Sequence, residues 1–457
     1  MAPPSALTAH LTSTAVANSI AENNYTERQS VIESTAPIDA PKLAELDPFK
    51  LKVTITKTPR QFHADASKIQ WGKTDVSTDH WITAKWSETE GWTAPELKPY
   101  GPISLWPTAS CLHYATECFE GMKAYRGVDG SLRIFRPTKN TARMLVSSTR
   151  IALPSFSPSA LEELIKILLA TDGPKWLPKS GSFLYIRPTL IGTGGALGVH
   201  KPTEAMLFIV LAQFPVLYEK PMKLLASRED SIRAWPGGFG FAKVGANYGP
   251  SLMAQKEAQA RGYDQILWLF DKSCQVTEAG ASNFFVIWKN KDTGRIELVT
   301  APLDDKIILD GVTRRSVLEL ARDRLTCPTG DIQGLDIVER KYTMMDLVDA
   351  AKEDRLLETF AAGTAFFISS VTRIHFRGED ISPKQTNGKY TSLLRGWLKD
   401  IMYGEESHEW AVQVSETGFK VDNSAAEKEI DQMAEKLRQM KANPAFAAAL
   451  QKVQAEI

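Results

Sequence analysis

Cysteine is scarce in this chain, with four residues among 457. They are Cys111, Cys118, Cys274 and Cys327. None forms a CxxC pair, and no pair of histidines lies nearby at the spacing of a zinc site. The sequence therefore supports no metal site, and we expect reduced thiols in an intracellular protein. The seven histidines are scattered, and we interpret His80 and His113 as structural residues.

Long apolar runs and an excess of either charge are also missing. The longest apolar run, residues 205–217, contains Gln213 and Pro215. It is shorter than the about 20 residues that a membrane-spanning helix needs. Lys plus Arg and Asp plus Glu each number 54, so the formal net charge is zero. Such a balance gives no general attraction to nucleic acid or to an anionic membrane, and we expect a soluble protein that binds neither.

The first 45 residues lack the features of a targeting sequence. They are rich in Ala, Ser, Thr and Pro and have no hydrophobic core, which argues against a secretory signal. The first basic residue is Arg28, and Glu22 and Glu27 precede it, whereas transit peptides are rich in Arg and poor in acids. We expect a flexible leader on a cytoplasmic protein, with a mitochondrial location as the alternative.

The chain is too long for one small domain, because about 100–200 residues per domain is usual. Its 43% hydrophobic and 24% charged residues are ordinary for a globular protein. The predicted parts are a leader at 1–45, a small N-terminal α/β domain at 46–213, an interdomain linker at 214–222, a large β-rich domain at 223–415 and a helical C-terminal extension at 416–457. The extension contains a capping box, Ser424 to Glu427, and is expected to dock on the body or on a partner subunit.

Local patterns predict several elements. Residues 132–135 alternate apolar and basic side chains, which is typical of an exposed strand. A helix is predicted from Ser157, as its N-cap, to a stop at Gly173. Thr313 and Thr343 are predicted to cap two further helices. Further predictions are a helix at 138–150 and strands at 182–191, 205–212, 266–270 and 284–288.

A glycine-rich loop at residues 237–250, GGFGFAKVGANYGP, contains Lys243. A lysine is usually a solvated surface residue. Here the glycines allow the backbone to approach a flat cofactor closely. A lysine amine attacks carbonyls only when it is partly deprotonated, which burial and nearby positive charge promote. The loop therefore favours a reactive lysine over a solvated one.

A phenol and a carboxylate follow this lysine. Tyr248 lies five residues after Lys243, where its hydroxyl can bond the phenolate oxygen of pyridoxal phosphate (PLP). Glu278 precedes the segment AGASN and a predicted buried strand, which favours an inward carboxylate over an exposed one. A carboxylate at the pyridinium nitrogen keeps the ring protonated, so that the ring accepts electrons. The amine, the phenol and the carboxylate together predict a PLP site.

The phosphate of PLP needs hydrogen-bond donors. Residues 310–314, DGVTR, open a predicted helix, and the N–H groups and dipole of a helix N-terminus favour an anion. An ordinary cap at Thr313 gives the same pattern. Arg143 is a candidate guanidinium from the first domain, although taken alone it is typical of a surface helix.

An ordered set of motifs extends over about residues 65–415. It comprises Tyr114, 119–125 (FEGMKAY), 135–137 (FRP) with 143–145 (RML), 184–188 (LYIRP), 245–250 (GANYGP), 277–278 (TE), 311–314 (GVTR) and 363–365 (GTA). Each is modest alone, but in this order the set resembles the branched-chain amino acid aminotransferases, PLP enzymes of fold type IV. The resemblance implies a two-domain α/β (α+β) fold, with a smaller N-terminal α/β domain, a larger β-rich C-terminal domain and the cofactor between them. It also implies a homodimer.

The resemblance assigns roles to individual residues. Lys243 corresponds to the catalytic lysine that forms a Schiff base with PLP and shuttles the proton. The implied cofactor-binding residues are Arg143, Lys243, Tyr248, Glu278, Val312, Thr313 and Thr364. The implied substrate-binding residues are Trp71, Tyr114, Phe119, Tyr185, Arg187 and Ala365, with Leu197 and Val199 lent across the dimer to the neighbouring site. Arg187 is implied in accepting a glutamate γ-carboxylate.

The implied reaction is transamination of L-Leu, L-Ile or L-Val with 2-oxoglutarate, giving branched-chain 2-oxo acids and L-glutamate by a ping-pong mechanism. One methylene in a pocket is worth only about 1–3 kcal/mol, so the sequence does not rank the three amino acids. A biosynthetic and a catabolic enzyme would look alike. Some animal members carry a CxxC redox pair after GTA, whereas residues 366–369 are FFIS, so we predict no thiol switch there.

Other functions share parts of this pattern. A D-amino acid aminotransferase and an aminodeoxychorismate lyase have the same fold, and the YIRP and GANY segments favour the L-branched-chain interpretation. Residues 192–198, GTGGALG, are not a GxGxxG motif, which argues against an NAD-dependent oxidoreductase. A non-catalytic scaffold is a further alternative, and the set Lys243, Tyr248 and Glu278 argues against it.

Overall fold

The computed structural model describes residues 43–63, 68–70, 74, 76–214, 221–328, 330–365, 367–386 and 388–416. Its helices and strands belong to a compact unit that begins at Glu45. The predicted leader up to residue 42, the linker at 215–220 and the extension from residue 417 lie outside the described residues. The domain boundaries therefore stay a prediction.

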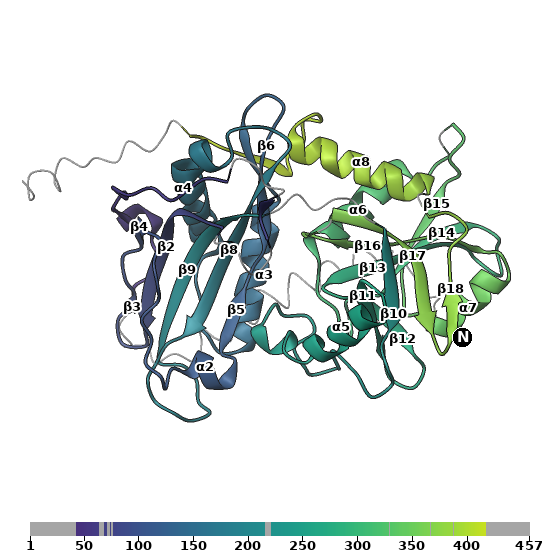
Figure 1. The fold of residues 1–457 in the computed structure, drawn as a ribbon, viewed down its shortest axis with the longest axis horizontal. Coiled ribbons are helices and arrows are strands. Elements are labelled where there is room, and N and C mark those ends of the chain that lie inside the picture. Colours follow the sequence, from purple (N-terminus) through teal and green to yellow (C-terminus); the bar gives the residue numbers. More distant parts are fainter. Residues whose placement is uncertain are drawn as a thin grey trace, which may run out of the picture. The chain divides into compact units, whose positions relative to one another are not determined.

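Ten strands form the first sheet. They are β1 (Lys52–Val53), β2 (Ser77–Ser87), β3 (Gly91–Trp92), β4 (Glu96–Pro99), β5 (Glu117–Phe119), β6 (Met122–Arg126), β7 (Leu132–Phe135), β8 (Phe183–Gly192), β9 (Glu204–Gln213) and β19 (Ala411–Val414). The order is β1-β4-β2-β9-β8-β6-β7-β19, with β3 beside β2 and β5 beside β8. Figure 1 labels the strands β4, β2, β9 and β8 of this sheet. The strands predicted at 182–191 and 205–212 are confirmed as β8 and β9.

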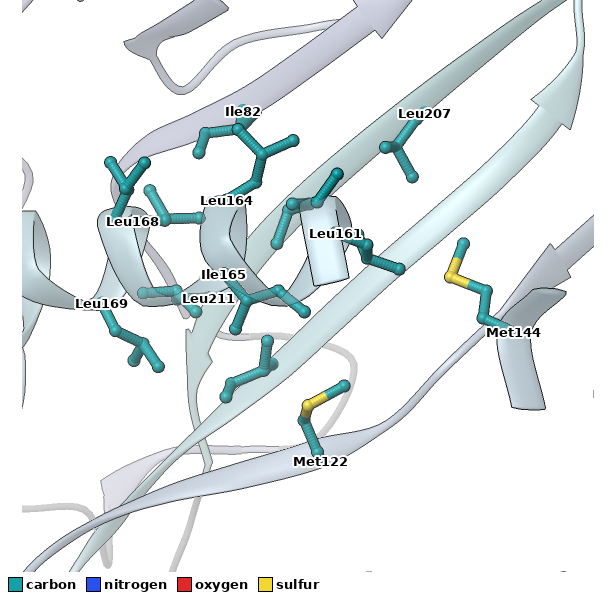
Figure 2. Packing of buried hydrophobic residues seen from close by; sticks show 14 of the residues in the cluster. Ile82, Met122, Met144, Leu161, Leu164, Ile165, Leu168, Leu169, Leu207 and Leu211 are labelled. Atoms are coloured by element: carbon teal, nitrogen blue, oxygen red, sulfur yellow. The ribbon is translucent and has the colours of Figure 1, made fainter. Parts of the chain in front are cut away.

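Three helices accompany this sheet: α2 (Ser110–Tyr114), α3 (Pro137–Arg150) and α4 (Pro158–Trp176). Figure 2 shows leucines of α4, Leu161 and Leu164 among them, packed with Ile82 of β2 and Leu207 of β9. Full burial of one such side chain stabilises the fold by about 1.5–3 kcal/mol. The helix predicted at 138–150 is confirmed as α3.

The predicted end of α4 at Gly173 is wrong, because the helix continues to Trp176. The Trp176 ring is buried, and its indole N–H donates to the Asp79 carboxylate at 2.9 Å, which holds the last turn in place. Ser157 precedes the helix as predicted, but its hydroxyl pairs with that of Ser159 at 2.8 Å instead of capping a backbone N–H.

The prediction of an exposed strand at 132–135 is also wrong. All four residues of β7 are buried, because β19 from the far end of the described chain pairs with the side opposite β6. The guanidinium of Arg133, which made the pattern look amphipathic, is compensated by two hydrogen bonds of 2.6 Å to Asp129. The pairing with β19, about 280 residues later, cannot be predicted from the local sequence of β7.

Nine strands form the second sheet. They are β10 (Met222–Ala226), β11 (Gln265–Phe270), β12 (Gln275–Ala279), β13 (Ser282–Lys289), β14 (Ile296–Thr300), β15 (Leu335–Glu339), β16 (Leu356–Gly363), β17 (Phe367–Phe376) and β18 (Glu379–Ile381). Because β12 pairs with both β11 and β13, the strands β12-β11-β10-β17-β16-β13 close into a ring. The strands predicted at 266–270 and 284–288 are confirmed as β11 and β13.

The second sheet is accompanied by α5 (Ser251–Ala260), α6 (Val312–Arg324), α7 (Met344–Lys352) and α8 (Lys389–Tyr403), and the short 3-10 helices are η1 (Pro48–Lys50) and η3 (Gly245–Asn247). Thr343 caps α7 in a complete capping box with Asp346, as predicted. The prediction for Thr313 is wrong, because Gly311 is the N-cap of α6 and Thr313 lies inside the helix. None of the helices in the described part of the chain is both long and apolar enough to cross a membrane.

Candidate active site

A cavity of about 320 Å³ lies where the two sheets meet, within the size range of small-molecule sites. Its walls come from β5, β8 and α3 on one side and from β12, α6 and the end of β16 on the other. The predicted site residues that line it are Phe119, Arg143, Tyr185, Arg187, Lys243, Tyr248, Glu278, Val312, Thr313, Thr364 and Ala365. The fold thus brings together segments that are far apart in the chain.

Lys243 is fixed through its backbone. Its N–H donates to Ser147 Oγ of α3 at 2.8 Å, and its carbonyl accepts from the Phe119 N–H of β5 at 3.1 Å. An antiparallel bridge between Cys118 and Val244 extends this pairing. The lysine therefore belongs to the edge of the first sheet and is half-buried, unlike a solvated loop residue.

The Lys243 amine meets the Tyr248 hydroxyl. Nζ donates to Oη at 3.1 Å and lies 5.0 Å from the centroid of the Phe119 ring. The short helix η3 brings the tyrosine back to the lysine, and Asn247 holds that turn by donating to the carbonyls of Phe239 and Ala242 at 2.9 and 2.8 Å. The pair is thereby positioned on a braced loop.

Glu278 on β12 is 2% exposed. Burial raises the pKa of its carboxyl, and the nearby guanidinium of Arg233 opposes this shift. Oε1 accepts from the Leu309 N–H at 3.1 Å and from Asn283 Nδ2 at 3.3 Å. Oε2 is 2.7 Å from Arg233 Nη1, but no hydrogen bond of good geometry reaches it. A buried oxygen with free acceptor capacity thus borders the cavity.

Gly311 lies where the loop approaches Asn283. A Cβ added at Gly311 would be 2.0 Å from Asn283 Oδ1, so the close approach requires glycine. Asn283 Nδ2 also donates to the Leu309 carbonyl at 2.9 Å. Because the asparagine contacts Glu278 as well, it ties the carboxylate to the loop that begins α6.

The N-terminus of α6 provides an anion-binding surface. The first N–H groups of a helix have no intrahelical acceptor, and the helix dipole adds positive potential. Val312 and Thr313 form this first turn, both are buried, and both line the cavity. The anion that suits such a turn is a phosphate or a carboxylate.

Arg143 reaches this turn from α3. Its Nη1 donates to the Asp310 carbonyl at 2.8 Å, while Nε and Nη2 donate to the two oxygens of Glu120 at 2.6 and 2.8 Å. Burial opposes the charge of Arg143, but the Glu120 carboxylate outweighs it and raises the arginine pKa. A guanidinium has five N–H donors, so two remain for a ligand.

The side-chain end of the cavity combines rings and one cation. Arg187 Nη2 donates to Tyr185 Oη at 3.0 Å, and its guanidinium lies 4.5 Å from the centroid of Phe119. The Tyr185 ring stacks on Phe214 at 4.6 Å. Arg187 Nε is buried without a hydrogen-bond partner. This end offers apolar faces and an unused donor.

Three of the predicted residues that the structure describes do not line the cavity. Tyr114, Leu197 and Val199 form a separate exposed group, in which the Tyr114 hydroxyl accepts from the Gly198 N–H at 3.1 Å. Leu197 and Val199 are 60% and 90% exposed. Trp71 lies outside the described residues.

Sequence reasoning missed Glu120, Arg233 and Asn283. Glu120 lies within the family motif at 119–125, and its place in that motif could have indicated that it belongs to the site. The roles of the other two depend on partners elsewhere in the chain, which no local pattern shows. Among the described residues, no group of three His, Cys, Asp or Glu side chains is arranged to hold a metal ion.

Comparison with known proteins places this cavity in context. The family model described as amino-transferase class IV matches residues 117–374. The mitochondrial branched-chain-amino-acid aminotransferase of Schizosaccharomyces pombe is 43% identical over 398 residues, covering 85% of this chain and 90% of that protein. The cytosolic branched-chain-amino-acid aminotransferase of Saccharomyces cerevisiae is 42% identical over 372 residues, covering 80% and 96%.

Solved structures show the same fold. A T.th. branched-chain amino acid aminotransferase, complexed with N-(5'-phosphopyridoxyl)-L-glutamate, matches with a TM-score of 0.57 and 26% identity, covering 73% of this chain and 98% of that chain. The same enzyme with pyridoxamine 5'-phosphate matches with a TM-score of 0.56 and 25% identity, with the same coverage.

Proposed function

The chain belongs to the class IV aminotransferase family, and on this premise we propose that it is a PLP-dependent branched-chain-amino-acid transaminase. It moves the amino group of L-leucine, L-isoleucine or L-valine to 2-oxoglutarate, which gives a branched-chain 2-oxo acid and L-glutamate. The observation that carries the proposal is the juxtaposition in one cavity of the Lys243 amine, 3.1 Å from the Tyr248 hydroxyl, and the buried carboxylate of Glu278.

The cavity residues fit PLP from one end to the other. Lys243 is a primary amine for its aldehyde, and Glu278 Oε2 is a buried acceptor for a protonated ring nitrogen. The first turn of α6 and the two remaining donors of Arg143 suit its phosphate. When bound, PLP supplies the electron sink that makes the Cα–H bond of an amino acid acidic.

Lys243 is the base in this proposal. Its Nζ takes the Cα proton of the substrate and returns a proton within the same cavity. One base suffices because both positions lie within its reach. Tyr248 holds the amine in position through its hydroxyl, and Ser147 fixes the backbone beneath it.

The side-chain end must accept two different substrates. The faces of Phe119 and Tyr185 suit an aliphatic side chain. Arg187, with its buried and unbonded Nε, suits the second carboxylate of 2-oxoglutarate or glutamate. A ping-pong transaminase must bind these two kinds of side chain in turn at the same place.

The decisive experiment is an assay of glutamate formation from L-leucine and 2-oxoglutarate by the purified, PLP-loaded protein. We expect activity, and we expect Lys243→Ala to fall by several orders of magnitude, because it removes the only proposed base. An inactive wild type that retains PLP would refute the proposed substrates.

The two rival activities of the same fold need their own controls. D-alanine with 2-oxoglutarate tests a D-amino acid aminotransferase, and pyruvate release from aminodeoxychorismate tests the lyase. We expect neither to exceed the rate with L-leucine. A preference for D-alanine would replace the present assignment.

Two further features belong to this proposal. The relatives include mitochondrial and cytosolic forms. We propose a cytoplasmic location, which the acidic residues before Arg28 support; recovery of the full-length chain in mitochondria on cell fractionation would contradict it.

We also propose a homodimer, supported by the exposure of Leu197 and Val199.

A further inference from the structure

Lys123 on β6 places a basic side chain in the interior, between two aromatic rings. The residue is 3% exposed. Its Nζ donates to the Ala365 carbonyl at 2.9 Å and lies 3.9 Å from the ring centroid of Phe183 and 4.7 Å from that of Phe367. Burial lowers the pKa of the Lys123 amine to about 7, and no carboxylate among the described residues opposes this shift. Burying an ammonium without an ionic partner costs stability.

Lys123 lies behind the wall of the catalytic cavity. It lines a second, much smaller cavity, and this cavity shares Val312, Thr313, Gly363 and Thr364 with the catalytic one. These four residues therefore separate the two spaces. On their other face, Val312, Thr313 and Thr364 are among the residues proposed to bind the cofactor.

The bond to Ala365 crosses between the two sheets. Lys123 belongs to the first sheet, and Ala365 lies at the tip of the β16–β17 hairpin, whose last pair is Gly363 with Phe367. Ala365 is exposed, so the packing around it does little to hold the tip. The 2.9 Å hydrogen bond from Lys123 Nζ reaches the carbonyl from the other sheet, and the lysine donates it whether or not it is protonated. It is therefore well suited to fix a short turn.

We propose that Lys123 is a positioning residue, whose Nζ–H donor fixes the Thr364–Ala365 turn against the catalytic cavity through the Ala365 carbonyl. The inference rests on the proposed function, because that function makes Thr364 and Ala365 part of the cofactor and substrate site. It explains why a residue that lowers stability stands at the cavity wall, since stability is commonly sacrificed where a site must be preorganised.

Lys123→Met tests this role, because methionine keeps the length and removes the charge and the donors. Loss of this hydrogen bond predicts a rise of about 10-fold in the KM for L-leucine and 2-oxoglutarate, with a smaller change in kcat. PLP release from the diluted holoenzyme should quicken by a similar factor. The Tm should stay equal or rise, because a buried charge is gone.

Two variants separate positioning from simple stabilisation. Lys123→Arg keeps a cationic donor, and we expect it to recover at least part of the KM. Lys175→Met removes a lysine that pairs with Asp79 at 2.8 Å away from the cavity, and we expect a lower Tm with unchanged KM. A full defect shared by Lys123→Met and Lys123→Arg would overturn the role of the donor.

The outcomes distinguish this inference from the proposed function. An active wild type whose Lys123→Met variant has unchanged KM values and unchanged PLP release overturns the inference alone. A wild type without transaminase activity overturns the proposed function. In that case the rate of PLP release still tests Lys123, because this rate needs no substrate: faster release supports the inference, and an unchanged rate overturns it.

Discussion

Glu120 decides the position of Arg143, although it was not among the predicted site residues. It is fully buried, and besides Arg143 its carboxylate accepts from Asn140 Nδ2 at 2.9 Å and from the Gly121 N–H at 3.1 Å. Burial raises its pKa, but the Arg143 guanidinium outweighs burial and holds the pKa below the ordinary value of 4.5. A carboxyl whose pKa is lowered in the folded state stabilises the protein at pH values above 4.5, and this stability is lost as the pH falls through the folded-state pKa.

Glu120→Gln should therefore leave Arg143 as an uncompensated buried charge. We expect a loss of about 3–5 kcal/mol in the free energy of unfolding at pH 7, measured by urea denaturation. The difference from the wild type should shrink as the pH falls below 4.5 and the wild-type carboxylate becomes protonated. PLP release should also quicken.

Asp336→Asn provides the matched control for Glu120→Gln. Asp336 pairs with Arg295, but 69% of the arginine side chain and 35% of the aspartate side chain are exposed. Exposed pairs contribute about 0–1 kcal/mol, so the control should remain close to the wild type at every pH. Equal losses in the two variants would contradict the role given to the Glu120–Arg143 pair.

The residue scale also shows how far the sequence could lead. Lys243 and Tyr248 were predicted to meet because they lie five residues apart in a glycine-rich loop, and Glu278 was predicted to point inward because it precedes a buried strand. The structure places all three in one cavity. Arg233 could not be found in this way, because its meaning comes only from its 2.7 Å approach to Glu278 across the fold. The binding roles of all these residues stay predictions.

At the scale of elements, the start of α6 depends on a glycine. A Cβ at Gly311 would meet Asn283 Oδ1, and Asn283 in turn contacts Glu278. Gly311→Ala should therefore displace either the asparagine or the first turn of the helix. We expect a stability loss of about 1–3 kcal/mol, typical of overpacking, together with faster PLP release from the holoenzyme.

Gly396→Ala makes the opposite prediction in another helix. Gly396 lies within α8, and a Cβ there would meet nothing within 4 Å. Alanine should stabilise the protein by about 0.4–1 kcal/mol, by reducing the freedom of the unfolded chain, and leave PLP release unchanged. If the two substitutions had the same effect on PLP release, the close approach at Gly311 would not be responsible.

Elements were predictable where their own sequence decided them. The apolar face of α4 and the apolar run in β9 are properties of a local window, and the strands β8 and β9 and the helix α4 were predicted, although α4 ends later than expected. The burial of β7 was not, because β19 covers it from the other end of the described chain. Thr313 was mistaken for a cap because Gly311, two residues earlier, already ends the extended segment.

At the scale of the whole molecule, the site is assembled from both sheets. Lys243 is paired with the first sheet through Phe119, whereas Glu278 and the first turn of α6 accompany the second. The motifs occur in the sequence in the order typical of the family, and it was the family resemblance that predicted that they meet in one site. Composition and periodicity alone did not predict the closed ring of six strands that supports Glu278.

Leu197 and Val199 extend this argument beyond one chain. Both are exposed, away from the cavity of their own subunit, and the loop that carries them is tied to Tyr114. Exposed apolar side chains on a held loop are expected to pack against another surface. If a second copy receives them at its cavity, the assembly is a two-fold dimer in which each copy completes the other's site.

The double variant Leu197→Glu/Val199→Glu tests that assembly. We expect the wild type to sediment as a dimer and the variant to show a weaker dimer, with kcat/KM for L-leucine lowered by about 10-fold or more, since two charges enter an apolar contact. Phe49→Glu is the control, because Phe49 is 94% exposed on η1 and no role is proposed for it. A wild type that is fully active as a monomer would show that each cavity works without a neighbour, and the two residues would then need another explanation for their exposure.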